Sequence, residues 1–291
     1  MYGIGNLTLD AIVESEEPFA DPFEFFPDAT PEVMEANAGW LKPRFQRPDT
    51  GRLMFCFQAY VLRGRHHTIL VDSCIGNDKE RPHRPTWHRR QGPFLDDLAA
   101  LGVKPEEIDY VLCTHLHADH VGWNTRLENG RWVPTFPNAK YVMAKTEYDF
   151  WEERYRENPK EPRMLAFADS VLPIVEAKRA VMVGMEHEID HGVWFEPAPG
   201  HTPGSVVVSL KSNGASGVLL GDTFHHPIQL VKPEWSSWVC EDKAQSAATR
   251  QALLDRYTDT DTLIAPAHFP APSVGHFVAE GGAVGYRMFG R

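Results

Sequence analysis

The stretch Thr114-His115-Leu116-His117-Ala118-Asp119-His120 places three imidazoles and a carboxylate within six consecutive positions. It directly follows residues 108–113, an apolar run typical of a buried strand. Side chains two positions apart on an extended segment point the same way, so His115 and His117 can bind one ion together. A tight turn after them would present Asp119 and His120 to a second ion. These ligand types suit zinc or a similar divalent transition metal, whereas the alternative is a histidine-rich surface loop.

The composition is that of a globular protein that does not bind nucleic acid. Of the 291 residues, 42% are hydrophobic and 24% charged, which is enough apolar material for a substantial core. The formal charge is −11, and no block rich in lysine and arginine is present to neutralise phosphates. We therefore expect one domain spanning residues 1–291 and no nucleic-acid partner.

Targeting signals and cysteine usage favour the cytoplasm. The first residues show no basic start followed by an apolar segment, and no apolar run is long enough to span a bilayer, so no membrane association is expected. The four cysteines are widely scattered and form no CxxC pair, which is typical of buried thiols in a reducing compartment: Cys56, Cys74, Cys113 and Cys240.

Strand and helix patterns alternate along the chain, which predicts an α/β protein. Two strand-rich regions are each closed by helices, so we expect two sheets stacked face to face with helices outside. Expected strands are 52–61, 68–71, 108–113, 141–144, 181–183, 193–195, 205–210, 218–220 and 263–265, and expected helices are 94–101, 147–156, 163–176 and 244–257.

Residues 17–50 follow neither pattern. Prolines and phenylalanines are mixed there without a period of 2 or 3.6, so we expect an irregular excursion that lies near the active site. Its aromatic residues, with others further along the chain, could wall an apolar pocket, although ordinary core and loop packing would explain them equally well. The predicted pocket residues are Phe23, Phe25, Phe26, Trp40, Trp87 and Phe224.

Further candidate ligands follow other strand-like runs. His201 stands in the rigid turn Gly200-His201-Thr202-Pro203-Gly204, just before an apolar strand. Asp222, His268 and Asp72 each come at or just beyond the end of a short apolar run. Taken singly, each residue would more often be structural; their joint placement after strands favours a shared cleft.

The ordered set HxHxDH, GHTPGS, GD and a late AH resembles the metallo-β-lactamase superfamily and spans Asp72 to His268. The resemblance implies an αββα sandwich of two mixed sheets flanked by helices, with a dinuclear metal site at one edge and two divalent ions, most often Zn²⁺. It also implies homodimerisation, and that Asp72 orients the imidazole ligands from behind. The implied ligands are His115, His117 and His201 for the first metal, Asp119, His120 and His268 for the second, and Asp222 for both.

Details of the motif argue against several branches of this superfamily. A carboxylate at Asp222 disfavours β-lactam hydrolysis, where Cys or Ser is usual. His117 in place of a glutamate disfavours the di-iron oxygen-reducing branch. All seven ligand positions are filled, which disfavours the mononuclear iron dioxygenases and a degenerate binding-only member. The helical substrate region of glyoxalase II-type thioesterases is not evident.

The implied chemistry is hydrolysis by a metal-bridging hydroxide. Two ions close together lower the pKa of a shared water, so no Ser, Cys or Lys nucleophile is needed. Asp222 is expected to take the proton of the nucleophile and pass it to the leaving group, and His225, three residues later, to stabilise the oxyanion. The alternative for His225 is a surface histidine beside His226.

The sequence therefore predicts a dinuclear metal-dependent hydrolase acting on a small apolar ester or lactone, such as an acyl-homoserine lactone. Lactonases of the superfamily commonly carry tyrosine at the offset of His225, whereas the methyl-parathion-hydrolase branch carries histidine and a similar tail after His268. A phosphotriesterase of that type is therefore the enzymatic alternative. A non-catalytic metal-binding protein is the alternative of a different class, and would be favoured if the seven side chains failed to converge.

Overall fold

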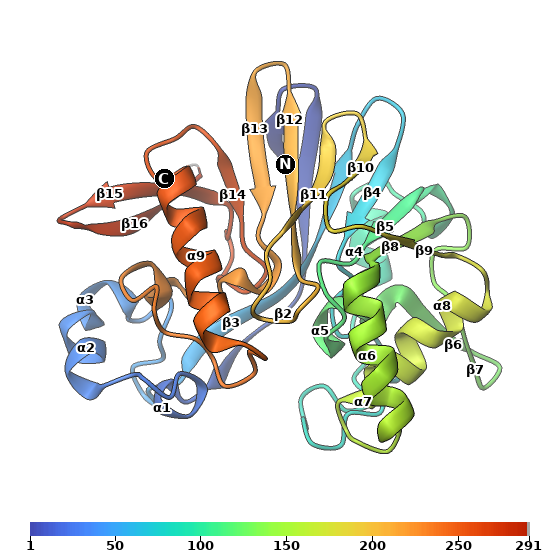
Figure 1. Cartoon of the computed structure of the whole chain (residues 1–291), viewed down its shortest axis with the longest axis horizontal. Coiled ribbons are helices and arrows are strands. Elements are labelled where there is room, and N and C mark those ends of the chain that lie inside the picture. The colour runs from blue at the N-terminus through green and yellow to red at the C-terminus, as the bar shows by residue number, and fades with distance from the viewer. Residues whose placement is uncertain (290–291) are drawn as a thin grey trace.

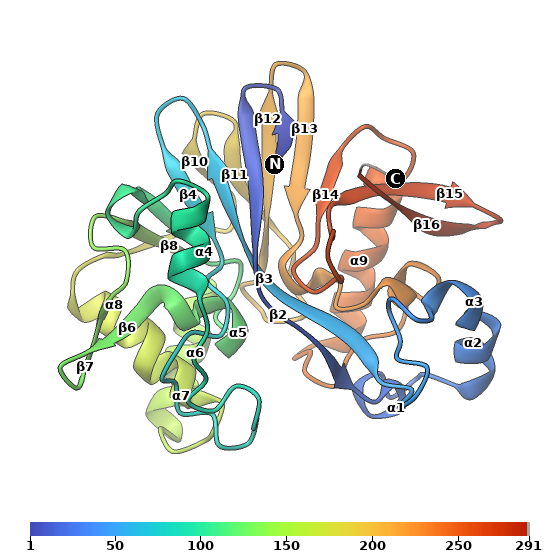
Figure 2. The same ribbon diagram turned by 180° about the vertical axis from the view of Figure 1, so that it is seen from behind.

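The computed structural model describes residues 1–289, which form two seven-stranded sheets with helices outside (Figures 1 and 2). In sheet order, the first sheet contains β1 (Tyr2–Ile4), β2 (Leu7–Ala20), β3 (Leu53–Arg63), β4 (Thr68–Val71), β5 (Tyr110–Leu112), β8 (Lys140–Ala144) and β9 (Ala180–Val183). The second contains β10 (His187–Asp190), β11 (Val193–Pro197), β12 (Val206–Ser212), β13 (Ala215–Leu219), β14 (Leu263–Ala265), β15 (Gly275–Glu280) and β16 (Ala283–Met288).

Helices cover the outer faces of both sheets. In Figure 1, α4, α6 and α8 lie beside the β5–β8–β9 side, and α9 lies beside β14. The helices are α1 (Pro22–Phe25), α2 (Pro31–Ala36), α3 (Ala38–Leu41), α4 (Phe94–Ala100), α5 (Ala118–Val121), α6 (Lys145–Glu157), α7 (Met164–Ala166), the π-helix η3 (Phe167–Val171), α8 (Leu172–Glu176) and α9 (Lys243–Tyr257), and β6 (Thr125–Glu128) and β7 (Arg131–Pro134) form a small hairpin. Within residues 1–289, no helix is long and apolar enough to cross a membrane.

Strand direction brings the candidate ligands to one edge. In the first sheet β4, β5 and β8 run parallel, so the segments that follow them leave from the same side. In the second sheet β13 and β14 are parallel, and β12 is antiparallel to β13, so β12 begins where β13 ends. The loop before β12 and the loops after β13 and β14 therefore meet at one edge of that sheet.

Three apolar layers hold the sandwich together. Between the sheets, residues such as Leu62 and Val71 share one buried cluster with Phe195 and Val208. A second cluster joins the first sheet to its helices and contains Trp151. A third joins the second sheet to α9. Burial of these side chains is the main stabilising contribution, and it fixes the position of one sheet edge relative to the other.

The αββα sandwich predicted from the sequence is confirmed, and each expected strand and helix has a counterpart. The N-terminal hairpin β1–β2, the C-terminal hairpin β15–β16 and β10 were not predicted. The expected excursion at 17–50 also differs in detail, because residues 17–20 continue β2 and three helices of four to six residues follow. Asp21 accepts hydrogen bonds from the backbone of α1, and Thr30 does the same for α2, so local capping orders these short helices.

A buried ionic cluster joins the long loop after β4 to the π-helix η3. Asp169 accepts two hydrogen bonds from Arg81, at 2.7 and 3.0 Å. The Lys79 ammonium lies 3.8 Å from Asp169 and 3.5 Å from the centre of the Trp132 ring. The side chains of Lys79 and Arg81 are 0% and 1% exposed, and burial lowers the pKa of Lys79 to about 7, so the buried Arg81 guanidinium is the main cation that Asp169 balances.

We expect the Asp169→Asn substitution to lower the free energy of unfolding by about 3–5 kcal/mol, because it leaves the buried Arg81 guanidinium without its counter-charge. Urea unfolding at neutral pH measures the loss. Asp149→Asn is the matched control, since it breaks the exposed Lys145–Asp149 pair on α6 and should cost no more than about 1 kcal/mol. Equal losses in the two variants would contradict the account of this cluster.

Candidate metal centre

Seven side chains converge where the two sheet edges meet. The turn after β5 supplies His115 and His117, and the one-turn helix α5 supplies Asp119 and His120. The second sheet supplies the other three from the loops before β12, after β13 and after β14: His201, Asp222 and His268. The sequence-predicted ligand set is thus brought together in full, and the dispersed arrangement that would favour a non-catalytic protein is not found.

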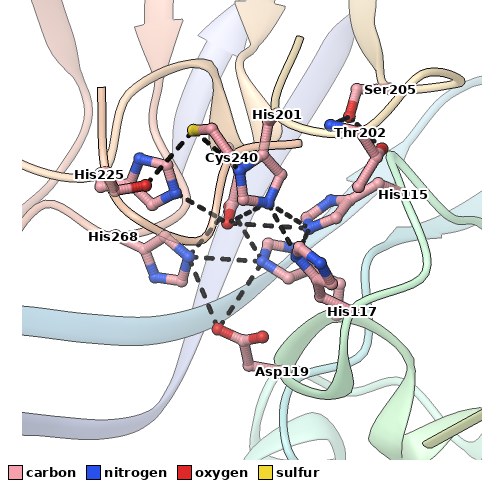
Figure 3. A network of polar contacts seen from close by, with 12 residues as sticks. His115, His117, Asp119, His201, Thr202, Ser205, His225, Cys240 and His268 are labelled. Atoms are coloured by element: carbon pink, nitrogen blue, oxygen red, sulfur yellow. Dashed lines mark hydrogen bonds and ion pairs between the residues drawn. The ribbon is translucent and has the colours of Figure 1, made fainter. Parts of the chain in front are cut away.

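The first group contains three ring nitrogens that almost touch. His115 Nε2 lies 3.0 Å from His117 Nδ1, and His201 Nε2 lies 3.2 and 2.7 Å from these two atoms (Figure 3). A hydrogen bond needs one donor and one acceptor, so three mutually adjacent nitrogens cannot all be paired with one another in any choice of tautomers. A cation bound by all three lone pairs removes this conflict.

The second group lies on the other side of Asp222. His120 Nε2 and His268 Nε2 are 3.3 Å apart, and both lie within 3.9 Å of Asp119 Oδ2. Asp222 Oδ1 is 2.9 Å from each of these two ring nitrogens. Its Oδ2 lies 3.2 Å from His201 Nε2 and 3.6 Å from His115 Nε2. One carboxylate thus presents a separate oxygen to each group.

The donor set fits two divalent cations. Three imidazoles and a carboxylate oxygen, and two imidazoles with two carboxylates, are both typical zinc-binding sets. Asp222 Oδ1 is buried, and although two ring nitrogens lie 2.9 Å from it, no donor in the described chain is aligned to hydrogen-bond with it, which is costly unless a cation satisfies it. The first group together with Asp222, and the second group, are the residues that could hold the two ions.

Protonation follows the same division. Burial lowers the pKa of His115 and His201 well below the usual value and that of His117 to about 4, so the first group presents neutral lone pairs. Burial also opposes charge on His120, but the neighbouring carboxylates raise its pKa. Asp222 itself stays ionised, because the surrounding histidines hold its pKa low against the effect of burial. The carboxylates around the second group therefore favour a positive charge at this position, and a bound metal ion would supply it.

Four of the five histidines in the two groups, all except His117, make a polar contact through Nδ1, the ring nitrogen that points away from the site. Such contacts select the tautomer that leaves the other nitrogen free for a metal. The partners are Thr114 Oγ1 for His115 at 3.2 Å, Asp72 for His120 at 2.8 Å, Cys240 Sγ for His201 at 3.5 Å and the Cys56 carbonyl for His268 at 2.9 Å. The sequence predicted this role for Asp72, but not for Cys240, which lies far along the chain in no recognisable motif.

Asp72 also holds the backbone of the metal-binding turn. Its carboxylate accepts hydrogen bonds from the Thr114 amide at 2.8 Å and from the Thr114 hydroxyl. Asp72 has φ +56°, a left-handed conformation that is uncommon for residues other than glycine. Strain of this kind persists only where surrounding contacts fix it, and here those contacts aim one carboxylate at both Thr114 and His120.

Two glycines let the His201 turn pack closely against the first turns of α9 and α6. A Cβ on Gly200 would lie 2.2 Å from the Ser246 backbone nitrogen, in the first turn of α9. A Cβ on Gly204 would lie 2.2 Å from the Glu147 backbone nitrogen, in the first turn of α6. Any side chain at either position would therefore push the turn off a helix. This close approach explains why both ends of the GHTPG motif are glycine.

An aromatic cavity of about 140 Å³ opens onto the two groups. Phe25 and Trp87, both predicted, line it. Phe19 also lines it; this residue stands in the expected aromatic excursion but was not among the six named pocket residues. The sequence did not point to Phe55, Phe57 and Trp238, which complete the aromatic lining, because their strand or loop patterns do not reveal which face meets the site. A larger groove of about 1180 Å³ lies at the opposite strand ends, but it contains none of the seven converging side chains.

The other four predicted pocket residues lie outside this cavity. Phe23 is 45% exposed on the outer side of α1. Phe26 is buried behind Phe25, against Trp235. Trp40 packs on Phe45 beside a different surface hollow, and Phe224 points into the core against Phe277. A chain that turns sharply every few residues sends neighbouring aromatics in different directions, which composition alone does not resolve.

His225 is buried in the cavity wall and is not a surface residue. Its side chain is 3% exposed, and its Nε2 lies 3.4 Å from Asp222 Oδ2. This contact is long, and neither ring nitrogen makes a well-aligned hydrogen bond within residues 1–289; burial lowers the pKa of the ring, so it is neutral and its one N–H has no well-aligned acceptor. His226 differs, because its Nε2 donates to the Phe45 carbonyl and its Nδ1 accepts from the Ile228 amide. His226 is therefore structural.

The chain belongs to the metallo-β-lactamase superfamily, whose family profile matches residues 58–268. Among characterised relatives, an N-acyl homoserine lactonase of Bacillus cereus is 28% identical over 123 residues, which cover 42% of this chain and 41% of that protein. The lactonase AttM of Agrobacterium fabrum is 35% identical over 66 residues, 23% of this chain and 21% of AttM. The matched segment thus spans less than half the length of these relatives.

Solved structures share the fold over nearly the whole chain. The hydrolase AbOPH of the β-lactamase superfamily superposes with a TM-score of 0.80 at 24% identity, covering 98% of this chain and 95% of AbOPH. AidC, a dizinc quorum-quenching lactonase, gives the same TM-score and coverage at 22% identity. At these identities the likeness establishes the fold.

We expect the Asp72→Asn substitution to weaken metal retention by about 10- to 100-fold, the usual effect of losing a group that orients a ligand. The amide cannot accept from both Thr114 and His120 as the carboxylate does. Metal content after dialysis against graded chelator concentrations measures the change. Asp10→Asn is the control, because Asp10 is also buried but pairs with Arg63 away from the site. Equal retention in Asp72→Asn and wild type would contradict this role.

Proposed function

We propose that this protein is a two-metal hydrolase of small apolar esters or lactones. The carrying observation is Asp222, whose two oxygens face separate histidine groups at the floor of an aromatic cavity. His115, His117 and His201 would hold one ion, and Asp119, His120 and His268 the other, with Asp222 shared.

Asp222 and His225 would have separate roles in the reaction. Bound divalent ions would supply a hydroxide nucleophile at neutral pH and polarise the carbonyl under attack. Asp222 is placed to accept the proton of the nucleophile and return it to the leaving oxygen, because it is ionised and central. His225 offers an unused N–H beside Asp222, which suits it to stabilise negative charge developing on the substrate oxygen.

The cavity supports a substrate with an acyl chain or an aryl group. Phe19, Phe25, Phe55 and Phe57 form one aromatic wall, with Trp87 stacked on Phe19 at 5.7 Å between ring centres. Such a wall buries apolar surface, worth about 0.8 kcal/mol for each methylene. The relatives named as N-acyl homoserine lactonases make an acyl-homoserine lactone the first substrate to test.

A phosphotriesterase is the second candidate, and His225 is the observation that favours it. The methyl-parathion-hydrolase branch has histidine at this offset, whereas lactonases commonly have tyrosine. A two-metal site with a neutral imidazole beside it can serve attack on a phosphoryl or an acyl centre. The aromatic wall would accept an aryl leaving group as readily as an acyl chain.

Purified protein should be assayed against acyl-homoserine lactones of increasing chain length, aryl esters, organophosphate triesters and thioesters, with and without chelator. We expect the highest kcat/KM with lactones or esters, a rise with chain length, and loss of turnover on metal removal that zinc restores. Comparable or higher kcat/KM with organophosphates would reverse the ranking of the two candidates. Turnover that survives metal removal would overturn the proposed chemistry.

We expect the His225→Phe substitution to lower kcat by about 100-fold with metal content unchanged, because it removes one charge-stabilising donor. Steady-state kinetics on the best substrate, with metal analysis of the same sample, provide the check. His276→Phe is the control, since His276 lies on β15, does not line the cavity, and its ring hydrogen-bonds to the Thr262 carbonyl. Wild-type kcat in His225→Phe would show that this ring takes no part in the reaction.

A further inference from the structure

Glu147 is a buried carboxylate that no motif in the sequence assigns to the site. It lies in the first turn of α6, its residue is 1% exposed, and it faces none of the seven converging side chains directly. A carboxylate so deeply buried is costly unless its oxygens are satisfied. The hydrogen-bond donors that satisfy these oxygens therefore indicate the structural role of Glu147.

Four donors converge on Glu147. Its Oε1 accepts from the Leu116 amide at 3.0 Å and from the Trp151 indole at 2.7 Å. Its Oε2 accepts from the Thr202 hydroxyl at 2.6 Å and from the Gly204 amide at 3.1 Å. Each oxygen thus reaches a different metal-binding loop.

Both loops carry ligands of the same ion. Leu116 lies between His115 and His117, and Thr202 directly follows His201. The two loops come from different sheets, and Glu147 joins them through one side chain. A second tie is the Val206 amide, which donates to the Thr114 carbonyl at 3.0 Å. The bare Cα of Gly204 allows the close approach that brings the His201 loop to this carboxylate.

We propose that Glu147 is the positioning residue of the first metal subsite, setting the spacing of His115 and His117 relative to His201. This inference rests on the proposed two-metal site but not on the identity of the substrate. Loss of Glu147 should loosen one ion and leave the other in place, because Asp119, His120 and His268 have no contact with this carboxylate among the described residues.

The Glu147→Gln substitution tests this with almost no change in shape. An amide nitrogen on the Oε1 side would face the Leu116 N–H and the Trp151 N–H, which can only donate. On the Oε2 side it would face the Gly204 N–H and the Thr202 hydroxyl, and a hydroxyl can turn to accept. The amide should therefore place its nitrogen on the Oε2 side, where the turned Thr202 hydroxyl can accept from it but the Gly204 N–H cannot, so the His201 loop loses its Gly204 tie.

Zinc release from the loaded full-length protein to excess chromogenic chelator provides the readout. Wild type should release zinc in two phases. His117→Ala should lack the phase of the first subsite, and His268→Ala the phase of the second, which assigns them. We expect Glu147→Gln to accelerate only the first-subsite phase, by about 10-fold or more. Thr202→Val, which removes one of the four donors, should accelerate the same phase less.

Glu14→Gln is the matched control. Glu14 is likewise a buried carboxylate; it accepts from the Ile75 and Gly76 amides and the Trp123 indole and pairs with Arg90 at 2.9 Å, outside both first-subsite loops. We expect comparable destabilisation in a thermal melt without selective acceleration of the first-subsite phase. An unchanged first-subsite phase in Glu147→Gln and Thr202→Val, or equal acceleration of both phases in Glu147→Gln, would overturn the role of Glu147. Wild-type protein that binds no zinc would instead overturn the two-metal site itself.

Discussion

The structure depends on one buried carboxylate, Asp222, that needs positive charge on two sides. A charge in a water-poor interior is tolerated only when it is paired, and ring nitrogens from both sheets surround this one. Meeting that need requires four segments from two separate sheets to arrive at one point. The αββα architecture satisfies the requirement because parallel strands deliver their carboxyl ends to a common edge.

Rigid support behind the site follows from the same constraint. Ligands that converge from two sheets keep their spacing only if each loop is fixed to something buried. Asp72 fixes the turn after β5, the helix ends at Gly200 and Gly204 fix the His201 turn, and Glu147 joins the two. The apolar layer between the sheets then prevents one edge from sliding past the other. Ligand geometry is thus a property of the whole sandwich.

Much of this arrangement could be predicted from the sequence. The HxHxDH run, and His201, Asp222 and His268 after their strands, are local patterns whose spacing has few structural solutions. Cys240 and Glu147 could not be found in that way, because each reaches the site through long-range packing and stands in an ordinary helical or loop context. The β15–β16 hairpin was missed because its six-residue strands are partly exposed and each contains a glycine, so their apolar alternation is weak.

The cavity shows a second limit of sequence reasoning. Residues 17–50 were expected to lie near the site; among the phenylalanines at positions 19–26 only Phe19 and Phe25 line the cavity, because short helices and turns send adjacent rings to opposite sides. Substrate choice therefore depends on details of the wall that composition does not encode. A two-metal site can attack an acyl or a phosphoryl centre by the same chemistry. The aromatic cavity wall and His225 would therefore determine which substrate is preferred.

Metal stoichiometry measured together with activity tests the account most directly. Protein purified without added chelator should contain two divalent ions per chain by elemental analysis, and Asp222→Ala should lose both bound metal and turnover, because this carboxylate serves both groups. Full turnover in an Asp222→Ala variant that retains two ions per chain would contradict the account.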